Sequence, residues 1–597
     1  MLPPGLVYLA RLLPHVLAPP VATYLSKIIS ERAFGLAIPR SFAIAAYVLS
    51  GPLLLLTSVQ IRDFRLRREA ASHGAVLAPS SPGMWGGLKV LFLNLEDLYP
   101  GEPITQISAK IGHTFSSALF FQNQLFTSSP ENIKRLLATD FAIFEKGAEF
   151  RSVMEPLLGT GVFAADGEMW RFHRQITRPF FHRARISDFT LFDEHAAHAL
   201  ALCKARLRKG YAVDFQDMVA RFTMDTATAF LFGRDVHSLD EGLVYPHNAQ
   251  PPVDSVSAAG SGDLKKSAQA FAAALQEAQS VTAMRMRFGP HWPLAEFWKN
   301  RLAKPLSEVR KFLDPILDEA VQRKRAKGIA TVKNSETEAE DREVAEGESL
   351  LDHLVNYTED HTILRDEILN ITVAGRDTTA CVLTFTAYML AEHPAVLAKL
   401  RTEILTVVGP TRAPTLDDFR DMRYLRAVLN ETMRLYSPVY NTQPTLFQGE
   451  DGTPIYVPAN TRTPYSTMVM HRRKDLWGQD ALEFDPERFL DERLHKYLTP
   501  NPFIFLPFNA GPRICLGQQF AYHEASFFLV RMLQTFSSIS TDLDAQPPIA
   551  KPPASWRVPG NDPSGWKAKE KIRPRSHLTL FVKGGLWVRM GEAEASG

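Results

Sequence analysis

Residues 508–517, which read FNAGPRICLG, place a cysteine where it could act as an anionic ligand. A turn containing Gly511 and Pro512 precedes Cys515, and a helical pattern begins after Gly517. The N-terminal end of a helix carries partial positive charge and free backbone N–H groups, both of which lower the pKa of a nearby thiol. The pattern therefore predicts a thiolate at Cys515, and a thiolate is the form of cysteine that binds metal ions.

Cys515 stands alone as a candidate metal ligand in its part of the sequence. No Cys-x-x-Cys pair or Cys/His cluster surrounds it, which argues against zinc and iron–sulfur sites. The other two cysteines, Cys203 and Cys381, lie in apolar helical patterns and are expected to be buried, inert thiols. A single axial thiolate on a haem iron fits Cys515, and the guanidinium of Arg513 could then pair with a haem propionate.

Two pairs of residues at helical spacing could hold charged groups. Glu431 and Arg434 are three residues apart on a helical pattern that ends near residues 437–438, so a second arginine could join them in a buried charge network. Trp170 and Arg174 are four residues apart, so an indole N–H and a guanidinium can converge on one carboxylate. Taken alone, each pair is also typical of an ordinary surface helix.

The longest helical pattern covers residues 362–393, is closed by Pro394, and would be roughly 50 Å long. Its middle, residues 374–379 (AGRDTT), combines a helix-weakening glycine with hydroxyl groups that compete for backbone carbonyls. We expect a local distortion there that opens a groove for a small ligand.

Together these patterns resemble the cytochrome P-450 superfamily of haem-thiolate monooxygenases. The family's cysteine-loop pattern, Phe-x-x-Gly-x-Arg-x-Cys-x-Gly, is matched at every fixed position from Phe508 to Gly517. Glu431 and Arg434 resemble its helix K motif, and Arg488, in the string FDPERF, resembles the third member of its Glu-Arg-Arg network. The resemblance implies a mainly α fold with small β-sheets (α+β), a long central helix and a loop that carries the cysteine ligand of a haem.

The resemblance also implies a role for each candidate site residue. Cys515 would be the axial ligand of the haem iron. In the long helix, Thr378 would donate a hydrogen bond to bound dioxygen, and Asp377 would connect that position to solvent protons, because the chemistry needs protons delivered into a dry pocket. The residues implied to bind the haem are Trp170, Arg174, Phe508, Gly511, Arg513 and Gly517, and those implied to form the structural network are Glu431, Arg434 and Arg488.

The fuller strings at residues 374–380, 471–475 and 507–526 are similar to the fungal alkane and fatty-acid hydroxylase branch of the superfamily. That branch oxidises a long apolar chain at or near its end. Where the branch usually has a proline and an arginine, this chain has Tyr440 and Gln443. This departure leaves open a broader substrate range that includes xenobiotic and aromatic hydrocarbons.

The Asp377–Thr378 pair favours a monooxygenase, which inserts one oxygen atom from O2 into a C–H bond. A haem-thiolate isomerase, dehydratase or peroxygenase would be expected to lose that pair, and a non-catalytic haem sensor or electron carrier would need no groove in the long helix. Electrons are expected from NADPH through a separate flavoprotein reductase, since the chain shows no Gly-x-Gly-x-x-Gly fingerprint. The formal net charge of +2 gives no reason to expect a nucleic-acid partner.

The composition is that of a folded protein: a chain of 597 residues with 45% hydrophobic residues can bury a large core. We expect a membrane-anchor region with its linker over residues 1–83 and one catalytic domain over residues 84–597. Three segments have the composition of surface insertions without a packed role, namely residues 240–263, 333–349 and 546–564.

Residues 41–61 carry no charge and are long enough to cross the roughly 30 Å of a bilayer core as one helix. Arginines follow at positions 62, 65, 67 and 68, so the positive-inside bias places the C-terminal bulk in the cytosol. Residues 12–25 are apolar but interrupted by prolines, and we expect them to lie at the membrane interface. The prediction is a single-pass protein of the endoplasmic reticulum membrane that acts on small apolar substrates.

Overall fold

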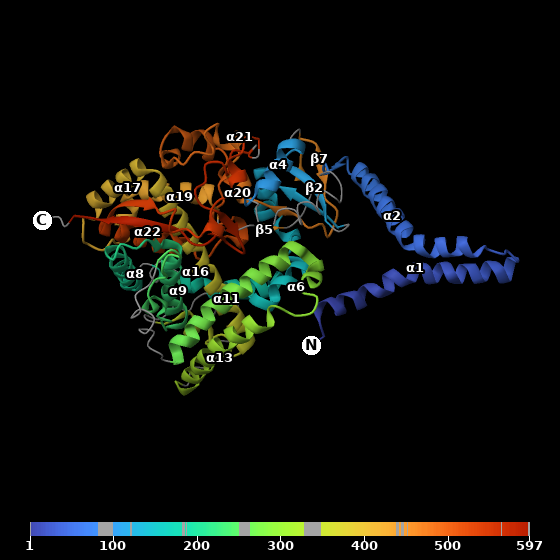
Figure 1. Ribbon diagram of the computed structural model, residues 1–597, viewed down its shortest axis with the longest axis horizontal. Helices are drawn as coiled ribbons and strands as arrows, with labels where there is room; N and C mark the ends of the chain where they lie inside the picture. The colour runs from blue at the N-terminus through green and yellow to red at the C-terminus, as the bar shows by residue number, and fades with distance from the viewer. Residues whose placement is uncertain are drawn as a thin grey trace.

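The computed structural model describes residues 2–80, 99–119, 122–181, 186, 188–249, 263–327, 348–437, 441–442, 447–449, 452–560, 562 and 564–594. Within these residues, helices make up most of the structure and the strands form four small sheets (Figure 1). The expected mainly α fold with small β-sheets is confirmed. The predicted domain boundary at residue 84 lies outside the described residues.

The described elements, in chain order within each class, have the following bounds. The α-helices are α1 (Pro4–Phe34), α2 (Arg40–Ser72), α4 (Glu102–Ile111), α5 (Pro130–Lys134), α6 (Gly147–Leu158), α7 (Gly167–Thr177), α8 (Thr190–Arg208), α9 (Phe215–Phe232), α11 (Asp263–Phe288), α12 (Trp292–Ala295), α13 (Ala303–Ala326), α15 (Leu350–Leu354), α16 (His361–Glu392), α17 (Pro394–Val407), α18 (Asp418–Asp421), α19 (Arg423–Leu435), α20 (Thr467–Met470), α21 (Lys474–Trp477) and α22 (Gln518–Thr535). The strands are β1 (Val76–Leu77), β2 (Thr114–Leu119), β3 (Gln122–Thr127), β4 (Val213–Asp214), β5 (Asn441–Thr442), β6 (Phe447–Gln448), β7 (Pro454–Tyr456), β8 (Pro464–Tyr465), β9 (Phe536–Thr541), β10 (Pro574–Ser576), β11 (Leu580–Val582) and β12 (Trp587–Glu592).

The sheets join strands that lie far apart in the chain, in the orders β2-β3-β8-β5, β1-β7-β6, β4-β12-β9 and β10-β11. The sequence predicts a hairpin between residues 578–582 and 586–589, and that prediction is wrong. β11 pairs with β10, whereas β12 pairs with β4 and β9. After the turn, the N–H of Leu586 donates to the carboxylate of Asp214 (3.0 Å), so a distant segment redirects the chain away from β11.

Helix α16 is the central element of the fold. It matches the helix predicted over residues 362–393 to within one residue at each end. Its first turn is capped by Asp360, whose side chain accepts the N–H groups of Thr362 and Ile363, and Pro394 closes its other end. The N-terminal half of α16 packs with α11 and α13 in one large hydrophobic cluster, and the C-terminal half packs with α19 and α22 in another.

The middle of α16 is regular. The helix is α-helical from His361 to Glu392, so the predicted distortion at residues 374–379 does not interrupt it. The hydroxyl of Thr378 does bond to the carbonyl of Ala374 (2.7 Å), as expected, but this bond adds to the helical pattern without breaking it. A threonine can therefore bond to the preceding turn here without opening the helix.

Helices α1 and α2 form an antiparallel pair that projects from the rest of the molecule (Figure 1). In the part of the chain that the structure describes, these are the two helices long and apolar enough to cross a membrane, and only 6% of each apolar window is buried. α2 contains the predicted span at residues 41–61. Residues 12–25, expected to form a short interfacial piece, belong instead to a continuous helix about as long as α2, with three prolines inside it.

Two of the three predicted insertions have packed parts: Leu243, in residues 240–263, is buried in the main core, and so is a residue of the third insertion. In residues 546–564, the side chain of Trp556 is buried in the main core, and its ring centre lies 5.6 Å from that of Tyr99. The prediction that this segment has no packed role is therefore wrong. One aromatic side chain buries enough apolar surface to hold the segment on the core, although its composition is rich in proline. Most of the insertion at residues 333–349 and part of that at residues 240–263 lie outside the described residues.

Candidate active site

The cysteine loop is held by its own backbone and by a segment far away in the sequence. The N–H of Cys515 donates to the carbonyl of Phe508 (3.0 Å), and α22 begins just after the loop, at Gln518. Gly511 has a φ of 68°, and a Cβ there would lie 1.7 Å from the carbonyl oxygen of Leu137. A side chain at position 511 is therefore excluded both by backbone conformation and by contact.

Cys515 differs from the other two cysteines in exposure. Cys203 and Cys381 are buried, as predicted; burial raises the pKa of Cys203 to about 12 and also raises the pKa of Cys381. Cys515 is exposed. A Cβ at Gly517 would have one neighbour within 4 Å among the described residues, Phe181 at 3.7 Å. The loop thus offers an accessible thiol with open space beside it, which fits axial ligation of a flat macrocycle.

The free thiol of Cys515 is not acidified as the sequence predicts. Its side chain is accessible, but the protein around it withdraws the thiol in part from bulk water. This burial raises the pKa of Cys515, and the N–H of Gly517 and the charge of Arg174 lower it only in part. The expected lowering is therefore wrong for the free thiol, although a coordinating metal ion would itself displace the proton.

Helix α7 brings Trp170 and Arg174 to the cysteine loop. Nη1 of Arg174 donates to the carbonyl of Ile514 (2.8 Å). The guanidinium of Arg513 lies 4.7 Å from the ring centre of Trp170, and that of Arg174 lies 6.0 Å from it. The structure thus places one aromatic ring and two guanidinium groups beside Cys515.

Arg513 also has a protein partner that sequence reasoning missed. Its Nη2 lies 3.0 Å from Asp166, which further accepts from Arg151 (2.7 Å) and from the N–H of Lys146 (2.8 Å). Burial and the nearby Arg513 lower the pKa of Lys146 to about 8. Two guanidinium groups thus bond to one carboxylate and the ammonium of Lys146 lies near enough to interact with it, and this excess of positive charge fits the two propionates of a haem. The position of Asp166 just before α7 is the only signal the sequence offers.

Asp377 and Thr378 lie in the middle of α16. Oδ1 of Asp377 is 3.5 Å from Nη1 of Arg376, and Oδ2 is buried without a hydrogen-bond partner among the described residues. A buried carboxylate oxygen that lacks a partner is a natural position for a proton or a bound water. Within the described structure, neither residue hydrogen-bonds to the cysteine loop. The next residue, Thr379, makes a hydrogen bond to the helix that follows the loop, in addition to the apolar packing between the two helices.

Glu524 on α22 is the partner in this hydrogen bond, and the sequence suggests no role for it. Its carboxyl group is fully buried, accepts from the hydroxyl of Thr379, and leaves Oε2 without a hydrogen-bond partner among the described residues. Burial raises the pKa of Glu524 to about 8, and the hydroxyl of Thr379 offsets this only in part. At neutral pH the group is therefore mainly a protonated acid.

A Glu524→Gln variant is expected to lose the part of the pH dependence of the unfolding free energy that arises from the ionisation of Glu524. The folded-state pKa of about 8 lies above the ordinary value of 4.5, so between these two pH values the native protein holds a proton that the unfolded chain releases. The contribution to the free energy of unfolding is therefore full below about pH 4.5 and falls as the pH rises toward 8, by at most about 1.4 kcal/mol per pH unit. Glutamine cannot ionise, so the variant lacks this slope.

Guanidinium unfolding of the solubilised protein at pH 6.0 and pH 7.5 measures the effect. The difference in unfolding free energy between the variant and the wild type should shift in favour of the variant by about 1–2 kcal/mol over this range. Glu308→Gln, at an exposed pair with Lys311, is the control and should leave the pH dependence unchanged. Equal slopes in wild type and Glu524→Gln would contradict a protonated Glu524.

The predicted Glu-Arg-Arg residues meet in one buried cluster. Arg434 donates to the carboxylate of Glu431 through Nε (2.6 Å) and Nη2 (2.8 Å), and Nε of Arg488 lies 3.5 Å from the same carboxylate. The N–H of Asp485 adds a further bond to Glu431 (3.0 Å). The side chains of Glu431, Arg434 and Arg488 have no exposed surface.

The cluster fastens α19 to the chain segment that leads to the cysteine loop. Nη1 of Arg434 donates to the carbonyls of His471 (2.8 Å) and Ala481 (2.6 Å). The ring of His471 in turn accepts the N–H of Leu506 (2.9 Å), just before the loop. Burial and the nearby Arg434 lower the pKa of His471 to about 3, so this ring is a neutral acceptor. Glu431 thus positions the loop through a continuous chain of contacts.

Known proteins are similar in sequence to this chain over most of its length. A family model described as Cytochrome P450 matches residues 79–562. The chain is 35% identical over 455 residues to Cytochrome P450 monooxygenase himC of Aspergillus japonicus, covering 75% of this chain and 73% of that protein. It is 36% identical over 440 residues to Cytochrome P450 52A3-A of Candida maltosa (71% and 77% covered) and 33% identical over 515 residues to Cytochrome P450 52A12 of Debaryomyces hansenii (83% and 93% covered). The chain therefore belongs to the cytochrome P450 family of haem-thiolate monooxygenases.

Proposed function

We propose that Cys515 supplies the axial thiolate to the haem iron of this monooxygenase. The observation that carries this assignment is that Cys515, alone among the three cysteines, has an accessible sulfur, in a loop whose shape Gly511 and Leu137 enforce. Trp170, Arg174 and Arg513 would hold the haem propionates. When bound, the haem supplies the binding and activation of dioxygen.

We propose that Thr378 and Asp377 deliver protons to the reacting oxygen. The hydroxyl of Thr378 bonds to the carbonyl of Ala374, so its oxygen lone pairs remain available to accept from a water while the hydroxyl can rotate to donate. Asp377 is largely buried and keeps one oxygen without a partner among the described residues, which suits a group that hands a proton on.

We propose that the substrate is a long apolar chain, an n-alkane or a fatty acid, hydroxylated at or near its terminal carbon. Support comes from the strings at residues 374–380, 471–475 and 507–526, which are similar to the fungal alkane and fatty-acid hydroxylase branch, and from the fungal origin of the relatives. Helices α1 and α2 would hold the protein at a membrane, where such substrates dissolve. Tyr440 and Gln443, which set this chain apart from the branch, lie outside the described residues.

We propose that electrons arrive from NADPH through a flavoprotein reductase that binds beside the cysteine loop. A groove of about 620 Å³ lies between α19 and α22, the helix that follows Cys515. Three arginines line it; Arg420 is paired with Asp417 (2.7 Å), and Arg423 and Arg426 have no ion pair among the described residues. This positive charge suits an acidic partner surface and would steer its approach.

We propose that the chain lies in the endoplasmic reticulum membrane with its catalytic domain in the cytosol, as the arginines after residue 61 suggest. The sequence predicts a single crossing by α2. The N-terminal turn of α1, however, rests on the catalytic domain: the N–H of Gly5 donates to the carbonyl of Phe297 (2.9 Å), and Tyr8 bonds to His291 (2.5 Å). This contact supports a second crossing of the membrane, by α1. The start of α1 and the end of α2 would then lie on the same side of the membrane.

Reconstitution with a flavoprotein reductase in lipid vesicles tests the proposed activity. With NADPH and 18O2, the full-length protein is expected to convert dodecane or lauric acid to products that carry one 18O at or next to the terminal carbon. Thr378→Ala should keep the haem and continue to oxidise NADPH, but yield on the order of tenfold less product per NADPH, with the balance as hydrogen peroxide, because proton delivery is impaired.

Thr384→Ala is the matched control. Thr384 lies on the same helix and makes the same bond to the preceding turn, to the carbonyl of Ala380 at 2.7 Å. Its replacement should leave the product yield per NADPH near that of the wild type. Oxidation of pyrene in preference to both chains would overturn the proposed substrate class, and full coupling in Thr378→Ala would overturn the role of Thr378.

A further inference from the structure

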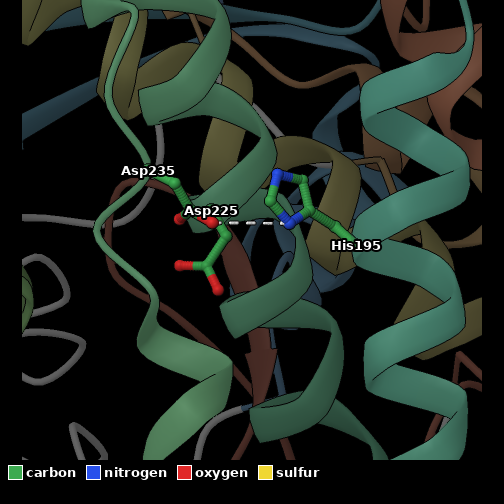
Figure 2. A group of neighbouring side chains, drawn as sticks. All are labelled: His195, Asp225 and Asp235. Atoms are coloured by element: carbon green, nitrogen blue, oxygen red, sulfur yellow. Dashed lines mark ion pairs between the residues drawn. The ribbon is translucent and has the colours of Figure 1, made fainter.

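A second group of chemically active side chains lies between α8 and α9 and includes none of the residues of the candidate active site. His195 comes from α8, Asp225 from α9, and Asp235 from the loop that follows α9. Figure 2 shows the side chains of His195 and Asp235 facing each other in the space between the helices, with Asp225 beside them. One ligand atom from each lies within 4.8 Å of the other two. His195 and Asp225 are buried, so this is an internal feature of the fold and not a chance meeting on the surface.

His195 has no hydrogen bond in the described structure. It is 5% exposed, and its Nε2 is buried without a partner. Its Nδ1 is directed at Asp235 but lies 3.7 Å from Oδ2, beyond hydrogen-bond distance (Figure 2). Buried imidazoles are normally hydrogen-bonded, so this one needs an explanation. Two ligands about 2.1 Å from one tetrahedral Zn²⁺ lie about 3.4 Å apart, which is close to the observed separation.

The cluster also carries negative charge without a matching cation. Asp225 is 1% exposed, and its two oxygens accept the N–H groups of Ser238 (2.7 Å) and Leu239 (2.9 Å), which leaves further lone pairs on each oxygen. No lysine or arginine among the described residues forms an ion pair with Asp225 or Asp235. The nearby Arg221 is bound to Asp217 and Glu241 on α9 and the following turn.

A second imidazole approaches from the solvent side. Nδ1 of His237 lies 3.0 Å from Oδ2 of Asp235, so this oxygen is placed between a buried and an exposed histidine. His237 lies outside the group of three whose ligand atoms lie within 4.8 Å of one another, so its exposed ring would have to turn toward the cluster to join it. One imidazole and two carboxylates, joined by this second imidazole, form a donor set that suits Zn²⁺ and related transition-metal ions. Ca²⁺ is disfavoured, since it takes six to eight oxygen ligands.

We propose that His195, Asp225 and Asp235 bind a divalent transition-metal ion, with His237 as the ligand that closes the site. The ion gives Nδ1 of His195, which faces Asp235 beyond hydrogen-bond distance, a partner and balances the two carboxylates. It fastens residues 233–241 to the α8–α9 pair, and because the site is closed by protein ligands its role is structural. This site is independent of the haem and of the proposed substrate.

Zinc binding to the chelator-treated, haem-loaded full-length protein tests the proposal. Isothermal titration with ZnCl2 and metal analysis after dialysis should find one tightly bound zinc per chain. The zinc K-edge absorption spectrum should show a first shell of nitrogen and oxygen with an imidazole contribution. His195→Ala should weaken binding at least a hundredfold and reduce the imidazole signal. His237→Ala, at an exposed side chain, should weaken binding about tenfold without a risk to folding.

His198→Ala is the matched control. Nδ1 of His198, on the same helix, lies 3.8 Å from a carboxylate oxygen of Asp240, a His–Asp separation like that of His195 and Asp235, but both side chains are partly exposed and, among the described residues, the pair belongs to no group of three candidate ligands. This variant should bind zinc as the wild type does. The absence of stoichiometric zinc, equal binding by His195→Ala and wild type, or a sulfur-containing shell around the zinc would overturn the proposal. Zinc should also raise the midpoint of thermal unfolding in the wild type and in His198→Ala, but not in His195→Ala.

Discussion

Cys515→Ser is expected to abolish both monooxygenase activity and the strongly red-shifted Soret band of the reduced CO complex. The assignment of Cys515 as the axial ligand requires this result, because a serine hydroxyl stays protonated near neutral pH and cannot supply the electron density of a thiolate. The fold should persist, since Cys515 is exposed and its loop is held by backbone bonds and by the packing of Gly511 against Leu137.

Absorbance of the dithionite-reduced, CO-saturated protein in detergent measures the result. The controls are Cys203→Ala and Cys381→Ala, which remove buried thiols whose raised pKa keeps them protonated. Both should retain the red-shifted band, with a modest loss of stability from the small cavity that each creates. A red-shifted band that survives in Cys515→Ser and is lost in either control would assign the thiolate to another cysteine.

The parts of the site that could be predicted from the sequence are those fixed by local spacing. The three-residue interval between Glu431 and Arg434 places both on one face of α19, and the structure joins them by two hydrogen bonds. The four-residue interval between Trp170 and Arg174 likewise brings both to the cysteine loop. The long helix was predictable to within one residue because Asp360 and Pro394 mark its ends locally.

The parts that could not be predicted depend on contacts between distant segments. Nothing near Gly511 in the sequence indicates that Leu137 will approach it, and nothing near Glu524 indicates a buried acid opposite Thr379. The sequence predicts the wrong sign for the pKa shift of Cys515, because the helix end is a local feature whereas the desolvation of the thiol depends on distant segments. Local patterns therefore give the identity of the site, whereas its electrostatics follow from the tertiary structure.

Glu431→Ala is expected to cost about 3–5 kcal/mol of stability, enough to prevent most of the chain from retaining haem. The substitution removes the one carboxylate that Arg434 and Arg488 share in a region with no exposed surface. The charges of the two arginines would then stay buried without the carboxylate that now offsets their loss of hydration. This uncompensated desolvation is the main cost in stability. Haem content per expressed chain and the guanidinium midpoint of the Soret band measure the loss.

A surface ion pair with the same spacing shows how much of the stability loss comes from burial and how much from the loss of a charge pair. Glu308 and Lys311 are also three residues apart and joined at 2.7 Å, but both side chains are partly exposed, so Glu308→Ala should cost less than about 1 kcal/mol. Removing Glu431 and Arg434 together, with Met at both positions, should recover only part of the loss. The carbonyls of His471 and Ala481, which Arg434 now satisfies, would then be left unpaired. Equal losses for Glu431→Ala and Glu308→Ala would show that the buried cluster does not hold the cysteine loop in place, and a complete recovery in the double variant would show that the carbonyl bonds of Arg434 add nothing to it.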